Sequence, residues 1–337
     1  MTITPMTKTQ PGNRDWKIVN AESFHTLEDL LEYCEIDPVK AGAVTHPDFA
    51  LRVTKYFASL IEKGNPRDPL LLQVLPKQKE FQVVSGYQRD AVGDGLSMPV
   101  RGLIHKYHGR VLLTMTGACA IHCRYCFRRH FPYRESRVDD DISGPVVKYL
   151  AENTSIREVI LSGGDPLMLS DQKLGKLIQA LNKLPHIRLL RIHSRLLSVL
   201  PERVNEGLIE TLLQFDGQVV MVTHINHANE LSAHNQAAFQ RMFEQGFSLF
   251  NQSVLLRGVN DDAQALMDLS YKLFESHITP YYLHRLDKVQ GAAHFDLSAE
   301  ESCEIYKVLL ASLPGYLLPA MVDEVAGQLS KTPVNCG

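Results

Sequence analysis

Residues 110–126 read RVLLTMTGACAIHCRYC, a short apolar run followed at once by three closely spaced cysteines. The run at 110–116 has the length and composition of a buried strand. The loop behind it carries Cys119, Cys123 and Cys126. Thiols brought together on one loop predict a metal site at the end of this strand, although three ligands are one short of the four that an iron–sulfur cluster usually takes from protein.

Downstream of this stretch, short apolar runs alternate with longer segments of helical periodicity, which is the pattern of repeated β-α units around a parallel sheet. Strands are expected at 110–116, 157–162, 187–194, 218–224, 248–256 and 277–284, with a seventh extended piece at 316–324. One helix is expected at 170–184, capped by Ser170 or Asp171, and others are expected to begin near Ser143, Pro201, Asn229, Asp261 and Ser298.

Six parallel strands with outer helices predict an α/β fold, a partial (β/α)6 barrel that is not fully closed. In barrels of this kind, sites gather at the carboxyl ends of the strands. Polar motifs follow the later strands at these ends: SGGDP at 162–166, HSR at 193–195, THINH at 223–227, RGVND at 257–261 and HRLD at 284–287. We therefore expect the motifs and the cysteine loop to share one rim.

The first hundred residues lack this rhythm and show amphipathic helices at 26–36 and 51–64. The expected domains are a disordered N-terminus at 1–15, a helical region at 16–104 packed on the barrel, the barrel itself at 105–325 and a C-terminal segment at 326–337.

The composition is ordinary for a soluble protein: of 337 residues, 45% are hydrophobic and 22% charged, and the formal net charge is −3. These values argue against a nucleic-acid-binding surface, and no run of apolar residues is long enough for a membrane span. The chain has six cysteines. Because three of them lie too close together for an ordinary disulfide framework and no export signal is present, a reducing, cytoplasmic setting is expected.

Other interpretations of the cysteine loop are a zinc site and a buried group of inert thiols. Zinc sites usually combine two CxxC pairs or add histidines. His122 is a possible fourth ligand, but its place inside the loop makes one tetrahedron awkward. An iron–sulfur cluster with one iron left free to chelate a small molecule is the favoured interpretation.

The spacing CxxxCxxC, with aromatic Tyr125 before the last cysteine, resembles the radical S-adenosylmethionine (SAM) superfamily. The resemblance implies a [4Fe–4S] cluster whose open iron binds SAM. SGGDP, with Gly163, Gly164 and Asp165, resembles the turn that receives the SAM amino group in that superfamily. Glycines there would let the backbone approach a ligand closely.

Residues from about 105 to 335 resemble the lysine 2,3-aminomutase family, whose members also use pyridoxal 5'-phosphate (PLP). The shared stretches are RVLLTMTGACAIHCRYCFRR, SGGDPL, THINHANE, LLRGVND, DKVQGAAHF and SKTPV. The resemblance implies that Lys331, before TPV, forms the Schiff base with PLP. The family usually has a run of glycines before this lysine, whereas this chain has AGQLSK.

The same resemblance implies an isomerase that converts (S)-α-lysine to (R)-β-lysine through a 5'-deoxyadenosyl radical and a PLP aldimine. It implies that Arg128 holds the substrate carboxylate, that Asp287 and Asp323 meet the side-chain ammonium, and that Arg110 meets the PLP phosphate. Opposite charges at the two ends favour lysine over glutamate. The remaining residues expected to contact SAM or PLP are His193, His224 and Gln252.

This chain lacks the C-terminal zinc cysteines of the catabolic lysine enzymes and has Asp262 where they carry a cysteine. It thereby resembles the short bacterial branch, which works beside a lysyl ligase to modify elongation factor P. The implied partners are L-lysine and a reductant such as flavodoxin or ferredoxin. Alternatives are a free-standing aminomutase of catabolism or β-amino acid biosynthesis and a non-catalytic iron–sulfur or zinc protein.

Overall fold

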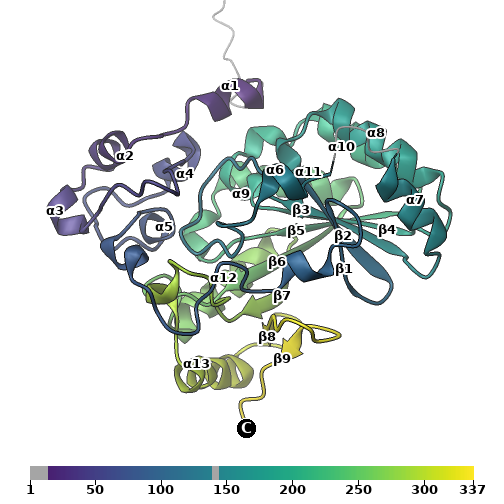
Figure 1. Ribbon diagram of the computed structural model, residues 1–337. Helices are drawn as coiled ribbons and strands as arrows, with labels where there is room; N and C mark the ends of the chain where they lie inside the picture. Colours follow the sequence, from purple (N-terminus) through teal and green to yellow (C-terminus); the bar gives the residue numbers. More distant parts are fainter. Residues whose placement is uncertain (1–13, 139–143) are drawn as a thin grey trace, which may run out of the picture.

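The centre of the molecule is one nine-stranded sheet in a computed structural model that describes residues 14–138 and 144–337 (Figure 1). The strands are β1 (Leu103–Tyr107), β2 (Arg110–Thr116), β3 (Glu158–Gly163), β4 (Leu189–Ser194), β5 (Gln218–Thr223), β6 (Ser248–Val254), β7 (Thr279–His284), β8 (Ala320–Asp323) and β9 (Thr332–Pro333). They pair in sequence order, parallel from β2 to β8 and antiparallel at β1 and β9.

This sheet confirms the predicted partial barrel. The six predicted strands correspond to β2–β7, and the seventh extended piece is β8, which continues the parallel order. The sheet stays open, because β1 and β9 are its two ends. Strand β1 was not predicted; it begins at the end of the region expected to be helical, at Leu103, and forms a hairpin with β2.

Helices cover the outside of this sheet (Figure 1). They are α6 (Tyr133–Ser136), α7 (Pro145–Glu152), α8 (Asp171–Asn182), α9 (Leu196–Val199), α10 (Glu206–Leu213), α11 (Ala233–Glu244), α12 (Ala263–Glu275) and α13 (Ala299–Ser312), with short 3-10 turns η3 (Pro166–Met168), η4 (Pro201–Arg203), η5 (Ala228–Glu230) and η6 (Ala293–Phe295). Ser170 caps α8 as predicted, by accepting a hydrogen bond from the backbone N–H of Lys173. The helix start expected near Ser143 lies outside the described residues.

Five short helices precede the sheet and lie beside it in Figure 1. They are α1 (Trp16–Ala21), α2 (Leu27–Tyr33), α3 (Pro38–Ala41), α4 (Lys55–Ser59) and α5 (Pro69–Leu72), followed by the 3-10 turns η1 (Gln78–Phe81) and η2 (Asp94–Ser97). The helix expected at 51–64 is shorter than predicted, because Val53 bridges to Phe24 and Thr54 then caps α4. The N-terminus expected to be disordered lies outside the described residues, except for Arg14 and Asp15.

The N-terminal helices share a core with the barrel. Leu30 and Phe57 belong to the same buried cluster as Leu113 of β2 and Leu190 of β4. Apolar burial of this kind is the main stabilising contribution in a folded chain. The region at 16–104 is therefore held firmly enough to carry side chains into the barrel.

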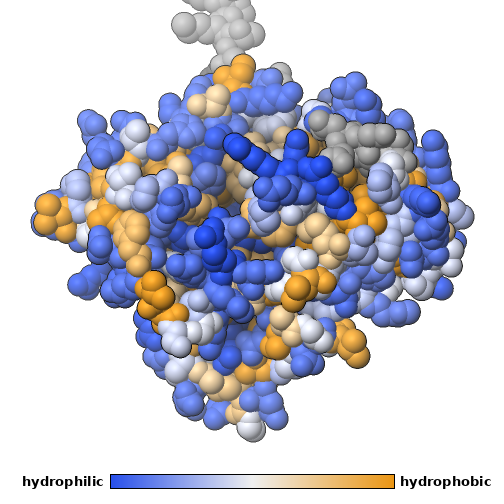
Figure 2. All heavy atoms as spheres, viewed as in Figure 1, coloured by the Kyte–Doolittle hydropathy of each residue, from blue (hydrophilic) through white to orange (hydrophobic). Residues whose placement is uncertain are grey.

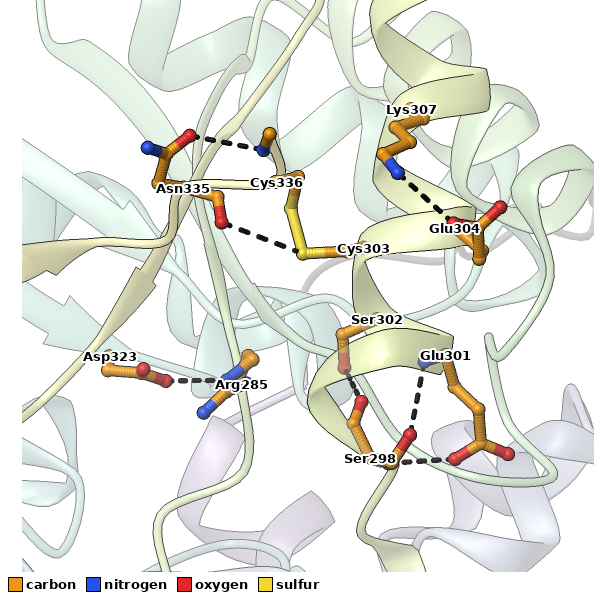
Figure 3. The surroundings of a disulfide bond; sticks show 11 residues. Arg285, Ser298, Glu301, Ser302, Cys303, Glu304, Lys307, Asp323, Asn335 and Cys336 are labelled. Carbon is orange, nitrogen blue, oxygen red and sulfur yellow. Dashed lines mark hydrogen bonds and ion pairs between the residues drawn. A yellow bond between two sulfur atoms is a disulfide. The ribbon is translucent and has the colours of Figure 1, made fainter.

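The six cysteines do not all remain free thiols. Cys303 of α13 and Cys336, near the C-terminus, form a disulfide (Figure 3). This pair was not predicted, because the two cysteines lie far apart in the sequence and meet only where α13 packs beside the segment that follows β9. The residues Cys34, Cys119, Cys123 and Cys126 are free.

Hydrophilic side chains cover most of the face drawn in Figure 2, with single hydrophobic side chains among them. Within the described ranges, no helix is both long and apolar enough to cross a membrane.

Candidate functional site

A cavity of about 460 Å³ opens at the carboxyl ends of the parallel strands. It lies within the size range of small-molecule and cofactor sites. All the predicted site residues except Asp323 line it: Cys119, Cys123, Cys126, Arg110, Arg128, Gly163, Gly164, Asp165, His193, His224, Gln252, Asp287 and Lys331. Residues that are 221 positions apart, such as Arg110 and Lys331, thus face one space.

The cysteine loop is anchored by the N-terminal region. Arg124, between two of the cysteines, is fully buried and donates to the carboxylate of Glu80 through Nε, at 2.9 Å, and through Nη2. Its Nη1 donates to the carbonyl oxygen of Phe49 at 2.9 Å. Arg129 Nη2 donates to the same Glu80 carboxylate at 2.7 Å. Although burial alone would raise the pKa of Glu80, the two guanidinium groups hold it below its usual value.

The glycines of SGGDP bring the end of β3 against the start of the cysteine loop. The backbone N–H of Gly164 donates to the carbonyl oxygen of Thr116 at 2.6 Å, and that of Asp165 donates to Ala118 at 2.8 Å. A Cβ added at Gly164 would lie 2.5 Å from the carbonyl oxygen of Ala118. Gly163 has φ +116°, which also favours glycine. In this structure, both positions require glycine because the backbone of the SGGDP turn lies directly against the cysteine loop.

The variant Gly164→Ala is expected to displace the cysteine loop, because its methyl group would overlap backbone atoms. The expected loss is roughly 1–3 kcal/mol in unfolding free energy, together with reduced iron and sulfide after anaerobic reconstitution. Gly315→Ala is the matched control, since no atom lies within 4 Å of the added Cβ. Equal iron and sulfide in the two variants would contradict the account of this turn.

The three cysteines line the cavity together, and burial affects the protonation of two of them. Burial raises the pKa of Cys126 to about 11 and that of Cys119 well above the usual value. Metal binding must therefore displace protons from these thiols. Within residues 14–138 and 144–337, no three His, Cys, Asp or Glu side chains are grouped so as to hold one metal ion. In a [4Fe–4S] cluster each thiolate binds a different iron, so the three sulfurs need not converge. His122, the possible zinc ligand, is tied through Nδ1 to the carbonyl oxygen of Ala50 at 2.8 Å.

Arg128 is fixed by partners on two sides. Its Nε donates to Asp94 at 2.8 Å, and its Nη1 donates to Ser162 Oγ at 2.9 Å. Asp94 also accepts from Lys106 Nζ at 2.6 Å. The guanidinium therefore has a rigid position at the cavity wall while Nη2 donates to none of the described residues. Asp94 was missed by the sequence analysis, because a single acid in a loop region carries no periodic signal.

Lys331 lies among ionisable side chains. Its Nζ donates to Glu324 at 2.9 Å and lies 3.4 Å from Nε2 of His284. The hydroxyl of Tyr107, in β1, donates to the other carboxylate oxygen of Glu324. Burial raises the pKa of Asp287 to about 7, against the opposing charge of Lys331. The Asp287 carboxylate accepts no side-chain hydrogen bond from the described residues and faces the cavity.

Asp323 does not reach the cavity. Its carboxylate accepts from Arg285 Nε at 2.8 Å (Figure 3), and Asp323 is absent from the cavity lining. Side chains alternate along a strand, and Met321, two residues earlier, packs in the cluster beneath α13. The residue directly after β8, Glu324, lines the cavity, as expected if the alternation continues past the strand. The apolar Met321 was thus a signal in the sequence for choosing Glu324 over Asp323.

His193, His224 and Gln252 meet at the ends of β4, β5 and β6. Gln252 Nε2 lies 3.4 Å from His193 Nδ1 and 3.2 Å from His224 Nε2. Burial lowers the pKa of His224 to about 3 and that of His193 well below its usual value, so both rings are neutral near pH 7. Nε2 of His193 is buried without a partner among the described residues. Such an orphaned atom fits a site that a ligand completes.

The Asp165 carboxylate forms hydrogen bonds that hold the fold together. One carboxylate oxygen caps η3 and accepts from Ser194 Oγ at 2.8 Å. The other accepts the backbone N–H groups of Arg195 and Leu196 at 2.9 and 3.0 Å. Asp165 therefore joins the SGGDP turn to the end of β4, with little capacity left for a ligand.

Comparisons with known proteins agree with this geometry. The Radical SAM superfamily model matches residues 113–269. The L-lysine 2,3-aminomutase of Escherichia coli (strain K12) is 45% identical over 333 residues, 98% of this chain and 97% of that protein. The L-lysine 2,3-aminomutase of Haemophilus influenzae is 48% identical over 334 residues, 98% of this chain and 99% of that protein. A solved structure, native anSMEcpe with bound AdoMet, aligns with a TM-score of 0.45 at 12% identity, covers 59% of this chain and 58% of that one, and is too distant to bear on function. The identities over nearly the whole chain show that it belongs to the L-lysine 2,3-aminomutase family of the radical SAM superfamily.

Proposed function

We propose that this chain is a lysine 2,3-aminomutase that converts (S)-α-lysine to (R)-β-lysine. The observation that carries the proposal is one cavity whose lining contains three cysteines, a fixed arginine, the half-buried carboxylate of Asp287 and Lys331. Its family consists of isomerases, and the family cofactors are a [4Fe–4S] cluster, SAM and PLP. When bound, the cluster and SAM supply a carbon radical, and PLP supplies an aldehyde that bonds the substrate amine.

The residues of the cavity fit these groups. Cys119, Cys123 and Cys126 would hold the cluster, and Lys331 would hold PLP. The orphaned Nε2 of His193 would donate to or accept from SAM or PLP, with His224 and Gln252 beside it. Arg110, at the start of β2, would contact the PLP phosphate, because a guanidinium binds phosphate oxygens in pairs. Gly163, Gly164 and Asp165 would shape the turn beside SAM.

The chain's own charges would orient a lysine substrate. Arg128, held by Asp94 and Ser162, would bind the α-carboxylate without having to be ordered first. Asp287 would attract the side-chain ammonium. We assign the second acid to Glu324, which lines the cavity, in place of Asp323, which binds Arg285. In this structure Glu324 pairs with Lys331 Nζ at 2.9 Å, and it would contact the substrate ammonium only where that pairing is broken.

The test of this assignment is turnover of L-lysine beside L-norleucine, which lacks the ammonium, and L-glutamate. The expected product is β-lysine alone. Norleucine would leave the Asp287 carboxylate without a partner, and the side-chain carboxylate of glutamate would be repelled by it. Comparable β-products from norleucine or glutamate would contradict the assignment of substrate.

The activity is expected to depend on the ionisation of Asp287. Since the pKa of this carboxyl lies at about 7 in the free chain, kcat/KM for lysine should rise as the pH increases through about 7, where the carboxylate forms. Asp287→Asn should lose this rise and weaken kcat/KM by roughly 10- to 100-fold, the worth of one charged hydrogen bond. An unchanged pH profile in the variant would assign the ionisation to another group.

We also propose that the β-lysine serves a ligase that attaches it to elongation factor P, with flavodoxin or ferredoxin as the reductant. The supporting observation is Asp262, which stands where the longer enzymes have a zinc cysteine. Its carboxylate accepts from the backbone N–H of Ala265 at 2.9 Å and caps α12. The test is a mass increase on elongation factor P when this enzyme, its substrates and the ligase are combined. If β-lysine accumulates and the factor stays unmodified, a free-standing aminomutase is the better assignment.

A further inference from the structure

Arg195 contacts one of the three cysteines directly. It follows β4, is only 7% exposed, and its Nη1 lies 2.7 Å from Cys123 Sγ. The same nitrogen lies 2.7 Å from the hydroxyl oxygen of Tyr125. A buried cation within hydrogen-bond distance of a metal-ligand sulfur is not explained by substrate binding or by the contacts that hold the loop.

Buried acceptors fix the guanidinium from the other side. Nη2 donates to Gln73 Oε1 at 2.6 Å and to Glu230 Oε2 at 3.1 Å. Glu230 is fully buried and its other oxygen accepts from the backbone N–H of Asn226 at 2.9 Å. Gln73 belongs to the N-terminal region, and its carbonyl oxygen accepts from the backbone N–H of Arg124 in the cysteine loop at 2.9 Å. One residue of that region therefore positions both the loop and the arginine.

We propose that Arg195 is a positioning residue that raises the reduction potential of the cluster by donating a charged hydrogen bond to the Cys123 thiolate. This inference rests on the proposed function, in which Cys123 is a cluster ligand. Reduction adds one negative charge to a cluster, so a nearby cation and an N–H···S hydrogen bond stabilise the reduced state more than the oxidised state. The effect is strong where solvent is excluded, and Arg195 is buried.

The hydrogen-bond pattern separates this role from a purely structural one. An arginine that only joined Glu230 to Gln73 would be satisfied by Nη2 alone. Nη1 points instead to the sulfur and to Tyr125, while Nε is buried without a partner among the described residues. The guanidinium is thus oriented toward Cys123, although this orientation leaves its Nε–H without a hydrogen-bond partner.

The test is the midpoint potential of the cluster, measured by an EPR-monitored redox titration of the full chain reconstituted anaerobically. Arg195→Gln should shift the potential to a more negative value. Arg195→Lys should shift it less, because lysine keeps the positive charge but lacks the paired nitrogens of the guanidinium. Arg203→Gln is the matched control: Arg203, like Arg195, is a buried arginine, but it binds Asp171 and the carbonyl oxygen of Leu167. The midpoint potential of the cluster in Arg203→Gln should equal that of the wild type.

Iron and sulfide analysis separates failure of the inference from failure of the proposed function. If the wild-type chain binds no cluster, the proposed function fails. If Arg195→Gln holds a full cluster with the wild-type potential, the inference is overturned. Should Arg195→Gln fail to bind a cluster, Arg195→Lys decides: a more negative potential supports the inference and an unchanged potential overturns it.

Discussion

Replacing Lys331 with alanine is expected to abolish β-lysine formation and to remove the visible absorbance of bound PLP. Lys331 lies beside both Glu324 and His284, whereas Lys106, which also lines the cavity, is paired with Asp94 at 2.6 Å. Loss of a covalent catalytic group typically lowers kcat by at least roughly 10³-fold. The measurements are the absorbance of the purified variant with PLP and its anaerobic turnover of L-lysine.

Lys307→Ala is the control for this variant. Lys307 lies on the exposed face of α13, where it forms a surface ion pair with Glu304 at 3.2 Å. It should keep full absorbance and turnover, because exposed pairs of this kind contribute little. A Lys331→Ala protein that retains the absorbance of bound PLP would show that another lysine holds the coenzyme.

Replacing Glu80 with alanine is expected to cause the largest loss of stability. Glu80 is the shared partner of Arg124 and Arg129, and all three side chains are at most 1% exposed. Its removal leaves two buried guanidinium groups without their carboxylate, at a cost of about 3–5 kcal/mol. Because Arg124 stands inside the cysteine loop, the variant should also lose iron and sulfide. Thermal unfolding and iron analysis measure the two effects.

The exposed pair of Arg257 and Glu301 provides the comparison. Both side chains are 46% exposed, so Glu301→Gln should change the free energy of unfolding by less than about 1 kcal/mol and leave the iron content unchanged. Equal stability of Glu80→Ala and Glu301→Gln would mean that the buried network does not hold the loop.

The barrel was predictable because its local signals agree with its tertiary structure. β3, for example, contains the apolar run at 159–161 and is buried along nearly its whole length, and α8 begins at a serine cap followed by leucines at helical spacing. The N-terminal region was less predictable. Its helices are four to seven residues long, too short for a clear helical periodicity.

The candidate site was predictable where it depends on motifs and was not where it depends on contacts between distant residues. The cysteines and Lys331 stand in recognisable stretches of sequence. Glu80 and Asp94, in contrast, lie in the short 3-10 turns η1 and η2 and acquire their roles only when the chain brings them to Arg124 and Arg128. The sequence motif alone did not indicate whether Asp323 or Glu324 faces the cavity. In the structure, Glu324 lines the cavity and Asp323 does not.

The measurement that tests the central claim most directly is an anaerobic reaction of the fully loaded chain with SAM, a reductant and isotopically labelled L-lysine. Iron, sulfide and PLP are quantified first, so that a missing cofactor is not taken for a missing activity. The account predicts labelled (R)-β-lysine as the product on a chiral column. Unchanged L-lysine from protein with complete cluster and PLP would contradict it.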